Sequence, residues 1–203
     1  FESYVEVKNL RKFFNTKRGL LHAVDDVSFT IGKGETLGLV GESGCGKSTL
    51  GRTIIRLLDA TGGEVLFDGQ DILKLNHSGM KNMRKKVQIV FQDPYSCLNP
   101  RLSVSKLIAE PLIVNKVFSN TEDLNKKIAE LMDTVGLARR LSDSYPHELD
   151  GGRRQRIGIA RALSLQPRFI VCDEPVSALD MSIQAQILNL LMDLQDELNL
   201  SYM

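Results

Sequence analysis

The sequence has few cysteines, almost no net charge and no long apolar run, and each shortage argues against a class of protein. Its three cysteines are an odd number without paired spacing, which argues against a disulfide framework or a zinc site and favours a reducing compartment. No apolar run approaches the roughly eighteen residues of a membrane helix, and residues 1–11 lack a signal-peptide pattern. The 26 basic residues nearly cancel the 25 acidic ones, so no net field attracts nucleic acid or anionic lipid. We therefore expect a soluble chain that reaches a membrane only through a partner.

The composition and the apolar patterns of the sequence predict a globular α/β domain. The chain has 203 residues, 42% of them hydrophobic and 25% charged, which is enough to bury a core. Apolar patterns of period two or continuous apolar runs predict strands, and apolar residues three and four apart predict helices. The expected strands are residues 4–10, 24–31, 36–40, 64–67, 87–91 and 169–172, and the expected helices are residues 47–58, 104–114, 124–135 and 182–198. No internal repeat or linker separates two independent domains.

The strongest chemical signal follows the strand expected at residues 36–40. It reads Gly41-Glu42-Ser43-Gly44-Cys45-Gly46-Lys47-Ser48 and fits the pattern G-x-x-x-x-G-K-[ST] at every fixed position. The glycines allow backbone N–H groups to point at phosphate oxygens, and the next helix adds the positive end of its dipole. Lys47 would reach the β- and γ-phosphates, and the Ser48 hydroxyl would coordinate magnesium. The motif predicts a nucleoside triphosphate site.

A second acidic site is expected at the end of the apolar strand at residues 169–172. Asp173 would assist magnesium, and Glu174 would accept a proton from the attacking water as general base. A solvated strand end is the plain alternative. The apolar run before two adjacent carboxylates, downstream of a P-loop, favours the catalytic interpretation.

Together, several motifs resemble those of ABC transporter ATPases, in the order that this family has them. They are Ser43 to Ser48, Phe91-Gln92-Asp93-Pro94, Gly151-Gly152 with Gln155-Arg156-Ile157, and Cys172-Asp173-Glu174-Pro175 with Ser177-Ala178-Leu179-Asp180. The resemblance implies a P-loop NTPase of the α/β class, with a RecA-like core of mainly parallel sheet, an N-terminal antiparallel β part and an inserted helical lobe. We expect a single nucleotide-binding domain over residues 1–203 with its helical lobe at residues 93–160. It also implies that the domain binds ATP and Mg²⁺.

Longer strings are similar to the peptide and nickel importer branch of that family. They are residues 92–101, 41–48 and 144–149. This resemblance implies an ATPase subunit that powers import of oligopeptides or dipeptides, with nickel or another solute as the alternative. Its partners would be a second nucleotide-binding subunit, identical or related, integral membrane permease subunits and, indirectly, an external solute-binding protein. The expected location is peripheral, at the cytoplasmic side of the cell membrane.

The family pattern also implies roles for single residues. Gln92 would contact magnesium or the attacking water, although a glutamine before Asp-Pro is also an ordinary loop residue. Phe14, with Phe13 as second choice, would stack on adenine, although adjacent phenylalanines often belong to a core. Thr49 and the P-loop residues 41–48 would hold the phosphates. Asp180 would cross the dimer interface, and it is equally suited to cap the helix that follows.

Two departures from the family pattern stand out. The signature loop normally reads Ser-Gly-Gly-Gln and faces the γ-phosphate on the partner, but here it is Asp150-Gly151-Gly152-Arg153. A carboxylate beside phosphate carries a penalty of about 1–4 kcal/mol, which Arg153 would partly offset. Alternatively, Asp150 turns outward as a helix N-cap. The family's switch histidine is also missing, since His22, His77 and His147 lie in other contexts, so we expect a C-terminally truncated domain.

Two other functions share parts of this pattern. ABC proteins that act on ribosomes or DNA usually carry two cassettes or a long coiled-coil insertion. This chain has one P-loop, a short segment between residues 92 and 150 and almost no net charge, so a nucleic-acid partner is not expected. A partner subunit that binds but poorly hydrolyses ATP is favoured by Asp150 and opposed by Glu174.

Overall fold

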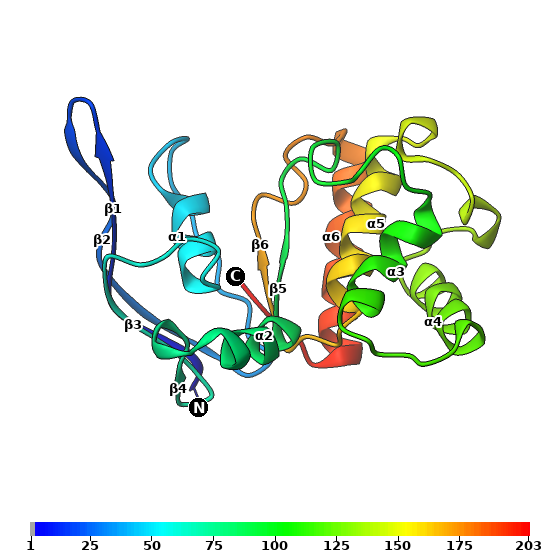
Figure 1. Ribbon diagram of the computed structural model, residues 1–203. Coiled ribbons are helices and arrows are strands. Elements are labelled where there is room, and N and C mark those ends of the chain that lie inside the picture. Colours follow the sequence, from blue (N-terminus) through cyan, green and yellow to red (C-terminus); the bar gives the residue numbers. More distant parts are fainter. Residues whose placement is uncertain (1–2) are drawn as a thin grey trace. The chain divides into compact units, whose positions relative to one another are not determined.

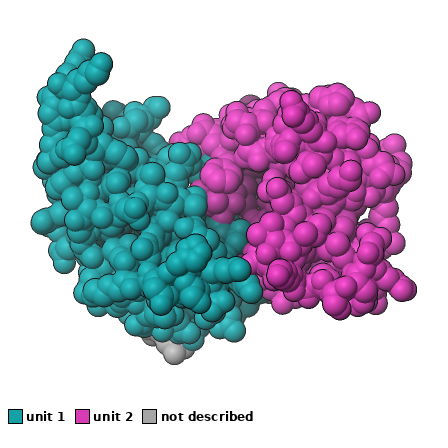
Figure 2. Space-filling view, in the orientation of Figure 1, with its two compact units in different colours: residues 1–88, 168–173, 198–203 teal, residues 89–167, 174–197 magenta. Residues whose placement is uncertain are grey.

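The computed structural model describes residues 3–203 and divides into two compact units, which Figure 2 colours teal and magenta. Unit 1 comprises the residues up to 88 together with 168–173 and 198–203, and unit 2 comprises residues 89–167 and 174–197. Each unit therefore combines segments that are far apart in the sequence. None of the helices in residues 3–203 has the length and apolar character of a membrane span.

Unit 1 is built on an antiparallel sheet with the strand order β2-β1-β3-β4. Its strands are β1 (Ser3–Thr16), β2 (Gly19–Gly32), β3 (Gly62–Phe67) and β4 (Gln70–Asp71). Val5 of β1 lies opposite both Ile31 and Phe67 and is fully buried. The helices of this unit are α1 (Lys47–Ile54), the short 3-10 helix η1 (Ile72–Lys74) and α2 (His77–Lys86).

β1 and β2 form a long antiparallel ribbon, drawn in blue in Figure 1, and part of β1 also pairs with β3. Its register shifts between Val7 and Leu10, where Asn9 adopts a left-handed φ of 46°. The Asn9 amide donates to the Ser28 hydroxyl at 2.8 Å instead of continuing the ladder. Such a bulge increases the local twist of the ribbon.

A second, smaller sheet has the strand order β5-β6-β7. It contains β5 (Val87–Val90), β6 (Phe169–Cys172) and β7 (Ser201–Tyr202), and β6 and β7 are parallel. β6 is apolar along its length, as expected for a strand covered on both faces.

Aromatic rings connect the two sheets inside unit 1. Phe67 of β3 lies edge-on to Tyr4 of β1, with ring centroids 6.2 Å apart, and to Phe169 of β6, with centroids 5.3 Å apart. All three rings are buried, and Phe169 has no exposed surface. Because one large ring can bury 150 Å² or more, this cluster is a main source of stability for the unit.

Unit 2 is helical. Its helices are α3 (Val104–Val114), α4 (Thr121–Thr134), the 3-10 helices η2 (Arg139–Leu141) and η3 (Pro146–Glu148), α5 (Gly151–Leu163) and α6 (Met181–Leu198). α3, α4 and α5 pack on one another. Their buried side chains include Leu107, Ile108, Leu112, Met132, Ile157 and Ile159.

The secondary structure confirms most of the expected elements and corrects two. Residues 36–40 do not form a regular strand: within them, Thr36 makes an isolated parallel bridge to Tyr202. The helix expected at residues 47–58 ends at Ile54. Arg56 has a left-handed φ of 55°, and its guanidinium donates to the carbonyls of Ile72 and Leu75, which turns the chain out of the helix.

The aromatic cluster leads to a stability prediction. Phe169→Ala should lower the free energy of unfolding by about 3–5 kcal/mol, because it removes a fully buried ring and leaves a cavity between two sheets. Urea denaturation followed by circular dichroism measures this loss. Leu20→Ala is the control, since Leu20 is 55% exposed, and equal stability of the two variants would contradict the role of the cluster.

Candidate functional site

Residues 41–48 form a tight loop that ends at the first turn of α1 in unit 1. Gly46 has a φ of 100°, and a Cβ atom on it would lie 2.3 Å from the carbonyl oxygen of Ala23. Gly44 also has a positive φ, of 79°. A side chain at Gly46 would meet both backbone strain and a fixed carbonyl, so this turn requires glycine there.

The ammonium group of Lys47 lies against this loop. Its Nζ atom donates to the carbonyl oxygens of Gly41 at 2.7 Å and Glu42 at 2.8 Å. The first N–H groups of a helix lack acceptors within the helix and carry the positive end of its dipole. The loop thus gathers a lysine charge and the start of α1 at one place, which is the chemistry that binds phosphate.

The P-loop helix is joined to the end of β6 by a buried carboxylate. Ser48 Oγ donates to Asp173 Oδ1 at 2.6 Å, and Arg52 Nη2 lies 3.4 Å from Asp173 Oδ2. The side chain of Asp173 is 5% exposed. Sequence reasoning brought Ser48 and Asp173 together but missed Arg52. The sequence holds one signal for Arg52: it is four residues after Ser48, and residues four apart lie on one face of a helix.

The donor atoms at this point suit magnesium. A hydroxyl and a carboxylate supply oxygen ligands, and Mg²⁺ is usually held by one or two carboxylates together with substrate phosphates. Within residues 3–203, no group of three or more His, Cys, Asp or Glu side chains is arranged to hold a metal ion.

In unit 2, Gln92 and Glu174 both have exposed side chains. Gln92 follows β5, and the next residue, Asp93, closes a turn by accepting the amide of Tyr95 at 2.8 Å. Glu174 has a left-handed φ of 46°. Strained backbone at a non-glycine residue persists where the surroundings fix it, and it is common at functional sites.

Asp150 is the N-cap of α5. Its Oδ1 atom accepts the amide of Arg153 at 2.8 Å, and its Oδ2 atom lies 3.3 Å from Arg153 Nη1. The structure therefore contains both features that the sequence suggested, the outward cap and the neutralising arginine. Both side chains are about half exposed, so the ion pair contributes little, about 0–1 kcal/mol.

The two glycines after Asp150 allow α5 to approach the start of α6. A Cβ on Gly151 would lie 3.0 Å from Leu179, and one on Gly152 would lie 2.6 Å from Ile183 Cγ2. Gly152 is buried whereas Gly151 is partly exposed. The signature loop thus has a packing reason for its second glycine that is independent of any ligand.

The two candidate adenine-stacking residues differ in their contacts. The Phe13 ring stacks on His22 with centroids 3.9 Å apart, so one of its faces is occupied. Phe14 lies under the ammonium of Lys12, which is 4.8 Å from its ring centroid. Both rings are partly exposed.

All three cysteines carry free thiols. Cys45 lies exposed in the P-loop, whereas burial raises the pKa of the Cys172 thiol to about 12 and also raises that of Cys97.

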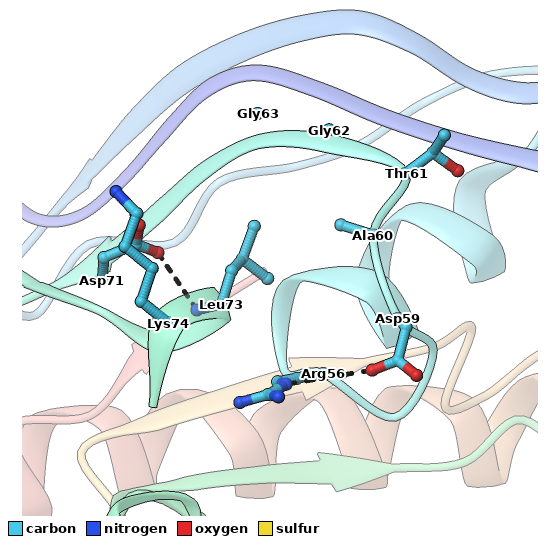
Figure 3. Close-up of a pocket in the computed structure, with 9 residues that line it drawn as sticks. All are labelled: Arg56, Asp59, Ala60, Thr61, Gly62, Gly63, Asp71, Leu73 and Lys74. Carbon is cyan, nitrogen blue, oxygen red and sulfur yellow. Dashed lines mark hydrogen bonds and ion pairs between the residues drawn. The ribbon is translucent and has the colours of Figure 1, made fainter. Parts of the chain in front are cut away.

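A separate pocket in unit 1 contains no P-loop residue. It has a volume of about 230 Å³ and is lined by Arg56, Asp59, Ala60, Thr61, Gly62, Gly63, Asp71, Leu73 and Lys74 (Figure 3). Its charged side chains are paired with one another: Arg56 Nε lies 3.9 Å from Asp59 Oδ1, and Lys74 Nζ lies 3.0 Å from Asp71 Oδ2. Internal pairing of this kind leaves little charge for a ligand.

Comparison with known proteins decides the family. The family model described as ABC transporter matches residues 24–177. The chain belongs to the ABC transporter family. This confirms the resemblance seen in the motifs and the P-loop NTPase fold class.

Relatives of known name cover nearly the whole chain. It is 53% identical to the oligopeptide transport ATP-binding protein OppF of Bacillus subtilis strain 168, covering 100% of this chain and 67% of that protein. It is 50% identical to the dipeptide transport ATP-binding protein DppF of Escherichia coli K12, covering 96% of this chain and 60% of that protein. The chain thus spans about two thirds of the length of these relatives.

A solved structure has the same fold. The dimeric post-hydrolysis state of the ATP-binding cassette MJ0796 bound to ADP and Pi superposes with a TM-score of 0.88 at 32% identity. The match covers 98% of this chain and 85% of that one.

The capping geometry gives a second prediction. Asp150→Ala should lower the free energy of unfolding by about 1 kcal/mol, because it removes the acceptor for the first turn of α5, whereas Asp150→Ser should keep most of the stability. Urea denaturation of the variants measures both. Asp143→Ala, at an exposed loop position, serves as control. If Asp150→Ala were as stable as this control, Asp150 would not be an effective cap.

Proposed function

We propose that this chain is the ATP-binding and ATP-hydrolysing subunit of an ABC importer for oligopeptides or dipeptides. The observation that carries the proposal is the hydrogen bond between the P-loop and the acidic end of β6, in which Ser48 Oγ donates to Asp173 Oδ1 at 2.6 Å. The substrate class rests on the names of the relatives, OppF and DppF. Nickel or another solute is the alternative cargo.

In the proposed mechanism, the chain's own residues bind the triphosphate and prepare water for attack. The amides of residues 41–49 surround the phosphates, and Lys47 moves its ammonium from the loop carbonyls to the β- and γ-phosphate oxygens. Ser48, Asp173 and Gln92 would hold Mg²⁺, which neutralises phosphate charge when bound. Glu174 accepts the proton of the attacking water, and Gln92 orients that water.

The remaining candidate residues act at the ends of the nucleotide. Phe14 would stack on adenine, with Phe13 as second choice. Each ring has one face covered, that of Phe13 by His22 and that of Phe14 by the Lys12 ammonium. Asp150, Gly151 and Gly152 would face the γ-phosphate bound to a partner subunit, and Asp180 would couple the two sites.

Hydrolysis is proposed to occur in a dimer. The second nucleotide-binding subunit is a copy or a relative of this chain, and the pair drives integral membrane permease subunits that receive solute from an external binding protein. The location is the cytoplasmic side of the membrane. We propose that residues 1–203 belong to one nucleotide-binding domain, with residues 93–160 as its helical lobe.

Nucleotide binding is the first test of this function. Lys47→Ala should weaken ATP binding roughly tenfold to hundredfold, since a charge-assisted hydrogen bond contributes about 1.5–3 kcal/mol. Isothermal titration calorimetry measures the affinity. Lys17→Ala, at the exposed turn between β1 and β2, should bind ATP like the wild type. Unchanged affinity in Lys47→Ala would overturn the P-loop assignment.

Assembly is the second test. Glu174→Gln should lower the hydrolysis rate by a factor of roughly 10² to 10⁴, because the amide cannot act as general base. ATP should then accumulate on the protein and shift it toward dimer, since a ligand stabilises the state that binds it best. Light scattering with and without ATP reports the mass, and Glu174→Gln combined with Lys47→Ala is the control. A mass that stays the same in ATP would argue against a nucleotide-bridged dimer.

A further inference from the structure

Gln155 is a buried polar side chain to which the mechanism above gives no role. It lies on α5 and is 1% exposed. Its Nε2 atom donates to two backbone carbonyls, that of Phe91 at 3.1 Å and that of Pro175 at 2.7 Å. A primary amide carries two hydrogens on one nitrogen, so each carbonyl can receive one of them.

The two acceptors are the neighbours of the two candidate catalytic residues in unit 2. Phe91 comes directly before Gln92, and Pro175 comes directly after Glu174. Gln92 and Glu174 themselves have exposed side chains on loops. Gln155 therefore fixes the backbone of both loops one residue away from the groups that would orient and deprotonate water.

Few other side chains could make this connection. Asparagine is one methylene shorter, and lysine would bring an ammonium ion into a site that is almost fully buried, which is costly. Pro175 has no N–H group, so its carbonyl is the only backbone hydrogen-bonding group through which it can be held. A buried neutral donor with two hydrogens on one atom fits this requirement.

The helix that carries Gln155 also begins at the signature loop. Asp150, the N-cap of α5, is five residues before Gln155, about one and a half helical turns. Gly152 is buried, and a Cβ there would lie 2.6 Å from Ile183 of α6, so this end of α5 is closely packed. Gln155 therefore attaches both loops to the helix that begins at the signature loop.

We propose that Gln155 is a positioning residue for ATP hydrolysis, holding the Gln92 loop and the Glu174 loop in register with α5 through one amide. The inference rests on the proposed ATPase function. Gln155 does not touch the nucleotide in this proposal. Its loss should therefore reduce the rate of the chemical step and leave ATP affinity nearly unchanged, because the phosphate loop belongs to unit 1.

The test uses Gln155→Met in the full-length protein, which keeps the length of the side chain and removes both donors. We expect kcat for ATP hydrolysis to fall at least about tenfold, while the Kd for ATP stays within about twofold of the wild type. Amide hydrogen exchange should become faster in the segments after Phe91 and after Pro175.

The matched control is Arg156→Gln. Arg156 is the next residue on α5, and its Nη1 atom donates to the carbonyl of Val135 at 2.6 Å, away from both loops. The control variant also loses a hydrogen bond from α5 to a carbonyl. It should be destabilised to a similar degree in thermal unfolding yet keep kcat within about twofold.

A double-mutant cycle with Gln92→Ala separates positioning from general destabilisation. If Gln155 acts through the Gln92 loop, Gln155→Met should lower kcat by a clearly smaller factor in the Gln92→Ala background than in the wild type. The inference is overturned if Gln155→Met lowers kcat by the same factor in the Gln92→Ala background as in the wild type. It is also overturned if kcat of Gln155→Met stays within twofold of an active wild type. A loss that Arg156→Gln reproduces overturns it as well.

Failure of the proposed function is recognised separately. A wild-type protein that binds no ATP overturns the ATPase assignment and the catalytic part of this inference with it. Hydrogen exchange then still tests the anchoring itself, and unchanged exchange in both loops of Gln155→Met refutes it.

Discussion

A carboxylate buried at the end of β6 needs polar partners, and in unit 1 these come from α1. Asp173 receives the Ser48 hydroxyl on one oxygen and lies beside Arg52 on the other. Without such partners, a charge with 5% exposure would be strongly unfavourable. Gly51, between the two partners in sequence, lets the helix approach β6 so closely that a Cβ would lie 2.8 Å from Val171. The position of the P-loop lysine and serine follows from this contact.

How much the sequence predicted depended on whether the determinants were local. The P-loop was predictable because Gly46, Lys47 and Ser48 act within a few residues of one another. The strand expected at residues 36–40 was wrong: strand formation depends on a partner that is distant in the sequence, and here Thr36 makes only an isolated bridge to Tyr202. The role of Gln155 was not predictable, since its acceptors are 64 and 20 residues away and are backbone carbonyls, which every residue type carries.

Asp150 illustrates how a departure from a motif can keep one function of the original residue. Serine and aspartate are about equally good helix N-caps, so the start of α5 is capped with either one. They differ in charge, because the aspartate brings a negative group to a loop that would face phosphate. The Arg153 guanidinium, 3.3 Å from Asp150 Oδ2, and the positive end of the α5 dipole both lower that negative potential. Aspartate at position 150 therefore keeps the helix cap of α5, while its negative charge is only partly offset by Arg153 and the helix dipole.

The backbone at Glu174 is strained, and hydrogen bonds to neighbouring carbonyls hold it in place. A left-handed φ of 46° costs a non-glycine residue about 1–2 kcal/mol. The amide and the hydroxyl of Ser177 both donate to the Glu174 carbonyl at 3.2 Å, and Gln155 holds the carbonyl of Pro175. Glycine would remove the strain but would also remove the carboxylate that the proposed chemistry requires. The hydrogen bonds to the carbonyls of Glu174 and Pro175 thus offset a cost that any non-glycine residue has at this turn.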